Sequence, residues 1–266
     1  MKRVHLFEFT DKSWYPQVFR GIQTDYLQFV ATLNKGHQNL MPLFQRALEN
    51  SPEKQIVDLC SGGTGPWKNL SEQLKQAGIA VKIKLTDKYP NLAAMRKINK
   101  ETSQEIEYLA DSVDATNVPA ELKGMRTLFE GFHHFRPEQA REILQDAVEK
   151  KEAIGIFEAS LKPPFGFLIL LLSPVMTLVS YILMTPFIRP ITFTRFLWTY
   201  LIPIVPLATC WDGIVSLLRV YSVQELEELT MSISNEDYVW EIGLASTGTP
   251  IFANTYLVGY PKSNHN

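Results

Sequence analysis

Apolar and polar positions alternate along much of this chain in a way that predicts strands separated by helices. Residues 81–87 alternate strictly and end in an acid, which is typical of a half-buried strand. Further segments have strand or helical character: strands at 55–58, 106–109, 126–130 and 153–158, and helices at 67–77, 91–100 and 137–150. Because the two kinds of element alternate, the sequence predicts an α/β, doubly wound, mostly parallel sheet. Its ligand crevice should lie beyond the carboxyl ends of the strands.

Two flanking regions extend this predicted domain. Aromatic side chains and leucines recur at roughly helical spacing through the first 50 residues, so we expect a helical cap over 1–50 that packs on the core or covers a pocket. Towards the other end, Ser222 and Glu225 form a capping box that opens a helix, and 238–244 pairs with 253–260 as a hairpin. The predicted core therefore comprises 51–162 and 212–266.

Residues 163–211 interrupt this core with two apolar runs. No charged residue occurs over the 24 positions 165–188 or over the 16 positions 196–211. As helices the runs would measure about 36 Å and about 24 Å, so only the first matches a hydrocarbon core of about 30 Å. The two halves of the core must share one compartment, so two spans would place Arg189 and Arg195 on the far side of the membrane. That arrangement opposes the tendency of basic residues to stay on the inner side. We therefore expect a helical hairpin that dips into one leaflet or covers an apolar pocket, with a buried hairpin as the alternative.

Composition narrows the classes of partner. The chain has 266 residues and a net charge of −2, so no nucleic acid partner held by bulk positive charge is expected. Cys60 and Cys210 are the only cysteines and are interpreted as reduced thiols of an intracellular protein. The first residues mix basic, acidic and aromatic side chains, which is not a signal-peptide pattern. We expect a cytoplasmic protein, with a peripheral contact on the inner membrane face through residues 165–210 as a further hypothesis.

The segment 55–65 carries the strongest chemical signal. A buried strand ends in Asp58 and enters a turn with three glycines in four positions, which indicates a nucleotide-type site because small residues let backbone amides approach a ligand. A phosphate-binding P-loop is excluded, since Lys68 lacks both the preceding glycine and the following Ser or Thr. A nicotinamide site stays open: Asp87 lies 22 residues after Gly65, although no Tyr is followed four positions later by Lys.

Four motifs in order give the chain a family resemblance. They are Val57-Asp58-Leu59-Cys60-Ser61-Gly62-Gly63-Thr64-Gly65, Leu85-Thr86-Asp87, Asp114-Ala115-Thr116-Asn117-Val118-Pro119 and Phe129-Glu130-Gly131-Phe132-His133-His134-Phe135. With these motifs the chain resembles the class I S-adenosylmethionine (SAM)-dependent methyltransferases over residues 52–160, with a weaker echo over 212–261. The resemblance implies a Rossmann-like, seven-stranded sheet closed by an antiparallel hairpin, and SAM as the cofactor of a transferase.

The resemblance also implies residue roles. Asp58 would lie near the amino acid end of the cofactor, Asp87 would accept both ribose hydroxyls, and Asp114 would accept from the adenine amino group. The full set of cofactor-binding positions is Asp58, Cys60, Ser61, Gly62, Gly63, Gly65, Asp87, Asp114 and Ala115. Cys60 and Thr64 stand where the family has glycines, which leaves the path of the loop open. In the alternative interpretation, Asp58 caps a helix and Asp87 only solvates a strand end.

Candidates for acid–base and acceptor chemistry follow the fourth strand and the apolar insertion. His133, His134, Glu130 or Asp212 could serve as a general base, which is optional if the acceptor ionises readily; packing is the alternative for the histidines. Beside the insertion, Ser216, Arg219 and Tyr221 could orient the acceptor, although Arg219 could equally pair with a nearby acid. The five histidines and two cysteines show no metal-ligand spacing, so no metal site is predicted.

The sequence thus predicts an enzyme that transfers the methyl group of SAM to a hydrophobic small-molecule or lipid-like acceptor. The insertion follows the fifth strand and should hang over the carboxyl ends of the strands, where the methyl group should point. Two alternatives stay open: a membrane-associated cofactor-binding protein without turnover, and an NAD(P)-dependent Rossmann oxidoreductase.

Overall fold

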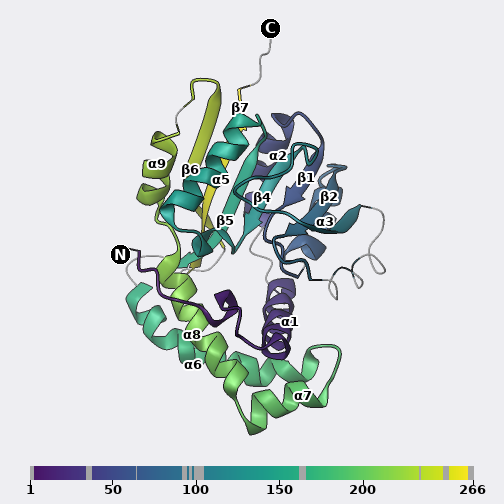
Figure 1. The fold of residues 1–266 in the computed structure, drawn as a ribbon, viewed down its shortest axis with the longest axis vertical. Coiled ribbons are helices and arrows are strands. Elements are labelled where there is room, and N and C mark those ends of the chain that lie inside the picture. Colours follow the sequence, from purple (N-terminus) through teal and green to yellow (C-terminus); the bar gives the residue numbers. More distant parts are fainter. Residues whose placement is uncertain are drawn as a thin grey trace.

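A computed structural model describes residues 3–33, 38–63, 65–91, 95, 98, 105–161, 166–233, 235–247 and 252–262. The described residues form a seven-stranded sheet with the order β3-β2-β1-β4-β5-β7-β6 (Figure 1). The strands are β1 (Gln55–Asp58), β2 (Lys82–Asp87), β3 (Ile106–Ser112), β4 (Met125–Phe129), β5 (Ile154–Leu161), β6 (Tyr238–Ser246) and β7 (Phe252–Pro261). Neighbours among β1 to β5 pair in parallel, whereas β7 runs antiparallel to both β5 and β6. The predicted fold class is confirmed.

Helices cover both faces of the sheet, which explains why β4, a central strand, is buried along its whole length. On one face, α2 (Met41–Glu49) and α3 (Trp67–Gln76) build an aromatic core in which Phe44, Trp67 and Phe129 touch. On the other face, α5 (Pro137–Glu149) and α9 (Val223–Met231) contribute apolar side chains to a second core. The predicted capping box of α9 is confirmed, with the Ser222 hydroxyl accepting from the Glu225 amide.

The observed strands extend the predicted ones at their carboxyl ends. β3 continues to Ser112 and β5 to Leu161, because each pairs further along its neighbour than the apolar pattern shows. Most of the helix expected over 91–100 lies outside the described residues.

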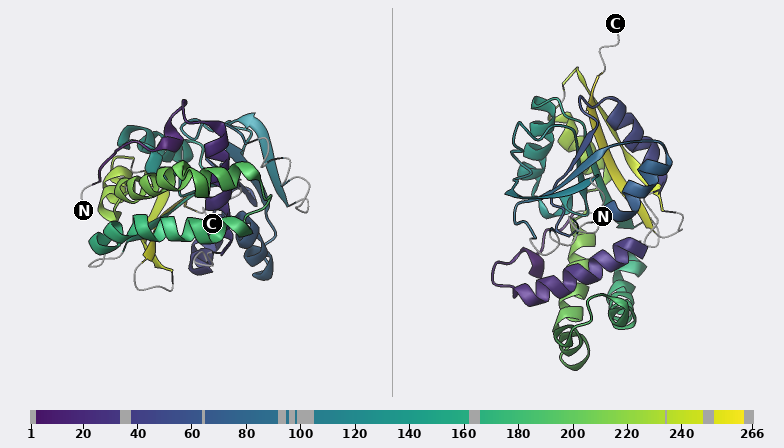
Figure 2. Two further views of the ribbon diagram at one scale, coloured as in Figure 1. Left: turned by 90° about the horizontal axis from the view of Figure 1, so that it is seen from below. Right: turned by 90° about the vertical axis from the view of Figure 1, so that its right-hand side faces the viewer.

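The first 50 residues separate into three parts. Residues 3–15 include the turn η1 (Phe9–Asp11) and begin beside α8, where the Val4 amide donates to the Leu218 carbonyl at 2.9 Å. Next, α1 (Gln17–Leu33) packs against the apolar insertion, as Figure 2 shows. Finally, η2 (Gln38–Leu40) leads into α2, whose apolar side chains belong to the core of the sheet.

The apolar insertion is a helical hairpin. Its two long helices, α6 (Gly166–Met184) and α8 (Ile204–Arg219), lie side by side (Figures 1 and 2). They are joined by η4 (Thr185–Phe187), α7 (Phe193–Phe196) and the π-helical turn η5 (Leu197–Leu201). The Tyr26 and Tyr181 rings stack at 4.0 Å, and the buried Arg195 pairs with Asp25 of α1. The tip of the hairpin is therefore held against α1.

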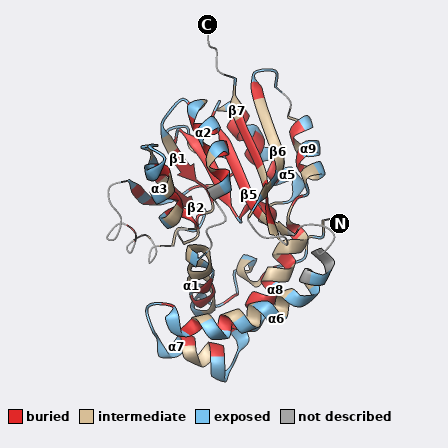
Figure 3. Ribbon diagram, turned by 180° about the vertical axis from the view of Figure 1, so that it is seen from behind, coloured by how far each residue is buried: buried red, intermediate tan, exposed pale blue. Residues whose placement is uncertain are grey.

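Much of the surface of this hairpin is apolar and exposed (Figure 3). Within the part of the chain that the structure describes, one helix is long and apolar enough to cross a membrane, over Leu170–Phe187, and 11% of that window is buried. The segments Phe193–Leu201 and Ile204–Arg219 are together long and apolar enough to cross a membrane, but they are bent by 72° where they meet.

Candidate active site

Acidic side chains gather at one edge of the sheet because parallel strands end there together. Asp58 and Asp87 end β1 and β2, Glu130 directly follows β4, and Glu158 lies in the second half of β5. The hairpin starts from this same edge, since α6 follows β5. The insertion therefore starts at the edge where the sequence predicts the ligand crevice, and its position over that crevice stays a prediction.

The glycine turn after β1 adopts left-handed backbone conformations that favour glycine. Gly62 has a φ of 55° and Gly65 a φ of 50°, and a Cβ built at either position would meet nothing within 4 Å. Cys60 also has a positive φ of 58°, so this departure from the family pattern keeps a glycine-like backbone. The Gln28 amide of α1 donates to the Gly65 carbonyl at 2.9 Å, which brings α1 over the turn. Thr64 lies outside the described residues.

Asp58 stabilises the glycine turn through hydrogen bonds to its carboxylate. Its carboxylate accepts from the Thr127 hydroxyl at 2.7 Å and from the Ser61 hydroxyl at 2.5 Å. Burial raises the pKa of the Asp58 carboxyl to about 6, against these two hydrogen bonds, which favour the charged form. Asp58 therefore organises the loop through its neighbours, and only 2% of its surface is exposed.

Asp87 bridges the glycine turn and the end of β2. One oxygen accepts from the Gly62 amide at 2.9 Å and the other from the Tyr89 amide at 2.8 Å. A carboxylate has about four acceptor sites, so each oxygen keeps capacity for a ligand hydroxyl.

Asp114 is half exposed and forms an ion pair with Lys88 at 2.6 Å, which lowers the pKa of the Asp114 carboxyl. Ala115 beside it is buried.

Glu130 is exposed, and its carboxyl group is influenced by the charge of Glu158. Its side chain is exposed, yet one carboxylate oxygen accepts from the Ala159 amide of β5 at 2.8 Å. The surrounding protein and, next, the Glu158 charge raise the pKa of the Glu130 carboxyl. A Cβ built on the neighbouring Gly131 would lie 3.4 Å from the Cys60 Cβ, so this residue abuts the glycine turn. Among the predicted bases, Glu130 is exposed and directly precedes the residue that abuts the predicted cofactor loop.

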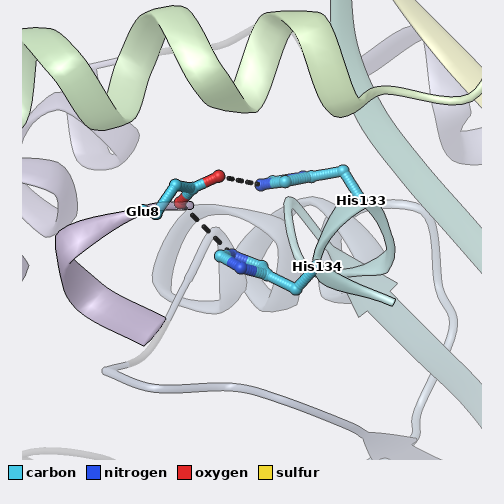
Figure 4. A group of neighbouring side chains, drawn as sticks. All are labelled: Glu8, His133 and His134. Carbon is cyan, nitrogen blue, oxygen red and sulfur yellow. Dashed lines mark ion pairs between the residues drawn. The ribbon is translucent and has the colours of Figure 1, made fainter. Parts of the chain in front are cut away.

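The two histidines belong to η3 (Phe132–His134) and are each bonded to a carboxylate. His133 Nδ1 lies 2.5 Å from a Glu158 oxygen, and His134 Nδ1 lies 2.9 Å from an Asp11 oxygen. The other Glu158 oxygen accepts from the Phe132 amide at 2.6 Å, which fixes the β5 acid to the turn. Figure 4 shows both imidazole rings beside Glu8, which belongs to residues 3–15, called the N-terminal segment below.

The predicted acceptor-side residues contact the N-terminal segment. Asp212 is buried and accepts from the Phe9 amide at 2.7 Å and the Gln23 side chain at 2.9 Å. Arg219 pairs with Glu8 at 3.0 Å and with Asp11 at 2.8 Å, which is the alternative left open for it. The remaining two are Ser216, which donates to Glu8 at 3.1 Å, and Tyr221, which donates to the Phe135 carbonyl at 2.9 Å. Their role toward an acceptor stays a prediction.

Several residues of this edge were missed by the sequence reasoning. Glu158 carries the same signal as Asp58 and Asp87, an acid towards the end of a buried strand, and could have been found from it. Thr127 sits inside a strand and is recognisable only from its bond to Asp58. No periodicity or spacing marks Glu8 and Asp11, because the turn that carries them is brought here by contacts with α8.

Comparison with known proteins adds structural neighbours. No protein-family model and no curated protein matches this chain. The structure of PigF with SAH has a TM-score of 0.50 at 14% identity, covering 94% of this chain and 63% of that one. Human N-acetylserotonin methyltransferase in complex with SAM has a TM-score of 0.48 at 12% identity, covering 98% and 63%. The LepI complex with SAM has a TM-score of 0.45 at 16% identity, covering 79% and 44%.

The structural likeness to PigF, at a TM-score of 0.50 and 14% identity, shows the fold alone. The seven-stranded sheet, with its antiparallel β7 between β5 and β6, is the Rossmann-like fold of class I SAM-dependent methyltransferases, as the sequence predicts. This chain spans 44% of LepI and 63% of PigF, so the activity and substrates of those proteins are not transferred with the fold.

Proposed function

We propose that this chain transfers the methyl group of SAM to a hydrophobic small-molecule or lipid-like acceptor. The observation that carries the proposal is the glycine turn, which Asp58 and Asp87 hold at the carboxyl edge of a methyltransferase-type sheet. An enzyme of this class needs such a loop because the cofactor must approach the backbone closely.

The residues at this edge fit an adenosyl cofactor. Open space beside Gly62 and Gly65 would admit the methionine and ribose, and the remaining acceptor capacity of Asp87 suits two ribose hydroxyls. Asp114 and Ala115 would border the adenine, with Lys88 sharing the Asp114 carboxylate. Asp58 would act mainly by fixing Ser61 and, through the turn, the backbone at the amino acid end of the cofactor.

The sheet topology disfavours the nicotinamide alternative. Dinucleotide-binding sheets have the strand order 3-2-1-4-5-6 and are mostly parallel. Here an antiparallel β7 is inserted between β5 and β6. The sheet topology does not distinguish an enzyme from a protein that binds the cofactor without turnover. Only an experiment can separate these two.

The reaction would be an in-line attack by a lone pair of the acceptor on the sulfonium methyl carbon. The new bond to the methyl group forms as the bond from that carbon to sulfur breaks, which leaves neutral S-adenosylhomocysteine. Alignment of the two reactants supplies much of the acceleration. For a hydroxyl acceptor, we assign the released proton to the Glu130 carboxylate, because Glu130 is exposed and the next residue, Gly131, abuts the glycine turn.

An apolar acceptor is supported by the exposed surface of the hairpin, which we call the apolar face. Its exposed large apolar side chains are Leu168, Leu171, Leu172, Val175, Met176, Val179, Ile182, Leu183, Phe187, Ile191, Phe193, Leu201, Ile202, Ile204 and Leu207. Monomeric soluble proteins rarely expose contiguous apolar patches larger than a few hundred Å². The exposed Trp14, Tyr200 and Trp211 are aromatic types enriched at membrane interfaces.

We propose that the apolar face rests on a membrane surface and that the acceptor reaches the crevice from there. The contact between Arg195 and Asp25 supports a peripheral hairpin, because it keeps the tip beside α1 instead of on a far side. The proposal is supported by the order of the elements, because α6 follows β5, which ends at the edge that holds Glu130 and the glycine turn.

Two measurements test the proposed function. Calorimetry with SAM should show one binding site per chain, and the absence of binding would overturn the enzyme and binding-protein readings together. Incubation with methyl-labelled SAM and a lipid extract should then transfer label into an organic-soluble product. Cofactor binding without transfer to any lipid or small-molecule extract would favour a protein that binds the cofactor without turnover.

A further inference from the structure

Three side chains with metal-ligating atoms meet between the N-terminal segment and η3: Glu8, His133 and His134 (Figure 4). One ligating atom from each can be chosen so that all three lie within 4.8 Å of one another. His133 Nε2 lies 3.7 Å from one Glu8 oxygen, and His134 Nε2 lies 3.8 Å from the other. Ligands of a tetrahedral zinc ion are separated by about 3.4 Å at ordinary bond lengths. The two separations from Glu8 exceed this value by a few tenths of an ångström, and the widest separation in the set by up to about 1.4 Å, so the side chains would have to move together to close around an ion.

Each of these ligand side chains is oriented by a second group. Glu158 accepts from His133 Nδ1 at 2.5 Å, since an ionised carboxylate can only accept. Asp11 likewise accepts from His134 Nδ1 at 2.9 Å, a shorter contact than the 3.4 Å between that nitrogen and Arg219 Nη1. In the neutral rings the lone pair is then on Nε2, the atom turned toward Glu8. Metal-binding histidines typically donate their other ring proton to a carboxylate in this manner. Arg219 and Ser216 hold one Glu8 oxygen at 3.0 and 3.1 Å, so the third ligand is oriented as well.

His133 supplies an independent sign that a ligand belongs here. Its side chain is 4% exposed, and its Nε2 has no hydrogen-bond partner among the described residues. The 3.7 Å to Glu8 is too long for a hydrogen bond. A buried nitrogen without a partner loses the hydration it has in water, and a metal ion would take up its lone pair. His134, with 33% of its side chain exposed, leaves a path for the ion to enter.

The local charge favours a divalent cation. Asp11 and Glu158 contribute two negative charges, Glu8 contributes a third when it is deprotonated as a metal ligand must be, and Arg219, which pairs with Glu8 and Asp11, contributes one positive charge. With Glu8 deprotonated and both imidazoles neutral, the cluster carries two negative charges. Two nitrogens and one carboxylate are ligands that zinc and other transition metals accept, whereas magnesium and calcium prefer oxygen ligands throughout.

We propose that Glu8, His133 and His134 bind one divalent transition-metal ion of the zinc type. Glu158, Asp11 and Arg219 position the ligands, and three protein ligands leave a coordination position open. The ion would tie the N-terminal segment to η3 beside the carboxyl edge of the sheet. The prediction of no metal site was drawn from spacing, which could not reveal a carboxylate ligand from a segment 125 positions before His133.

The test uses full-length, metal-free protein without an affinity tag, titrated with Zn²⁺ and with Co²⁺ in the absence of SAM. Calorimetry should show one ion per chain, and Co²⁺ should develop visible absorption bands. Glu158→Gln should weaken binding by about 10- to 100-fold, the usual effect of removing a group that orients a ligand. His134→Gln should weaken binding at least as much. His5→Gln changes a neighbouring histidine outside the cluster and should bind as wild type does.

Thermal unfolding shows that each variant is folded; His134 is partly exposed, so His134→Gln is expected to keep the fold. The proposal is overturned if wild type binds no stoichiometric ion, or if His134→Gln and Glu158→Gln bind it as tightly as wild type. SAM binding, measured separately on metal-free protein, reports on the glycine turn, so failure of this proposal is distinguishable from failure of the proposed function.

Discussion

In the sheet, apolar side chains face inward, and all five residues of β4 are buried. In α6 the same residue types face outward, with Leu171 and Leu183 each 65% exposed. The two regions differ in what surrounds them: β4 has strands on both sides and helices on both faces, whereas α6 packs on one side against α8. Apolar composition thus builds a core in one region and a surface in the other, and we propose that a membrane covers that surface.

The largest predicted effect comes from removing the proposed base at the sheet edge. This change should affect catalysis and leave the proposed function of the hairpin intact. Glu130→Gln should lower kcat by about 10²- to 10⁴-fold while leaving membrane binding unchanged, because a glutamine cannot take up the proton. In wild type, the surrounding protein and the neighbouring Glu158 charge raise the pKa of the Glu130 carboxyl, although the residue is exposed. Only the deprotonated carboxylate is a base, so kcat/KM should rise with pH through a range above that of an ordinary glutamate.

The matched control for this variant is Glu107→Gln, an exposed acid on β3. A Glu130→Gln enzyme with wild-type kcat and an unchanged pH profile would show that the acceptor ionises without this residue.

The converse test removes the outward apolar surface and leaves the sheet intact. Replacing Leu171, Val175 and Leu183 together by Glu should weaken binding to liposomes by at least about 100-fold, since each side chain buried in lipid contributes roughly 1.5–3 kcal/mol. Co-sedimentation with vesicles measures the loss, and calorimetry with SAM should give unchanged affinity. Met231→Glu and Leu244→Glu alter exposed apolar side chains on α9 and β6, away from the hairpin, and serve as controls. Equal sedimentation of the triple variant and wild type would refute the membrane contact.

Replacing Asp87 should have an intermediate effect, on SAM affinity alone, because this residue lies at the sheet edge. Asp87→Ala should weaken SAM binding by about 10- to 150-fold, the equivalent of losing a charged hydrogen-bond acceptor worth about 1.5–3 kcal/mol. Its hydrogen bond to the Gly62 amide would be lost as well, so the turn would loosen. Calorimetry measures the affinity, with Asp111→Ala, an exposed acid on β3, as the control. Unchanged affinity would mean that the ribose lies elsewhere.

The smallest predicted effect is on stability. Burial raises the pKa of Asp58 from 3.8 to about 6, so between these values the folded chain binds more protons than the unfolded one. Stability from this group is therefore present at low pH and is lost as pH rises through about 6. Asp58→Asn should raise the free energy of unfolding at pH 7.5 by about 1–3 kcal/mol and flatten this dependence, while weakening SAM binding.

Urea unfolding at several pH values measures the change, with Asp111→Asn as the control. A less stable Asp58→Asn protein at pH 7.5 would show that the bonds from Ser61 and Thr127 outweigh the cost of burying the charge.

Local patterns allowed the sheet to be predicted. Alternation over 81–87, the apolar run before Asp58 and the capping box at Ser222 each depend on neighbours a few residues away, and each became the expected element. Asp58, Asp87 and Glu130 could be named for the same reason, because they stand at or just after the ends of strands. Their common edge follows from parallel topology.

The sequence by itself therefore determined the sheet, its order of elements, the glycine turn and the apolar character of the hairpin, since short-range periodicity encodes all of these. Only the tertiary structure decided which groups meet across long distances. It placed Glu8 between His133 and His134, paired Arg219 with Glu8 and Asp11, and turned one side of α6 to the outside. The physical reason is that such contacts depend on how segments pack, and a side chain's neighbours in space leave no periodic trace in the chain.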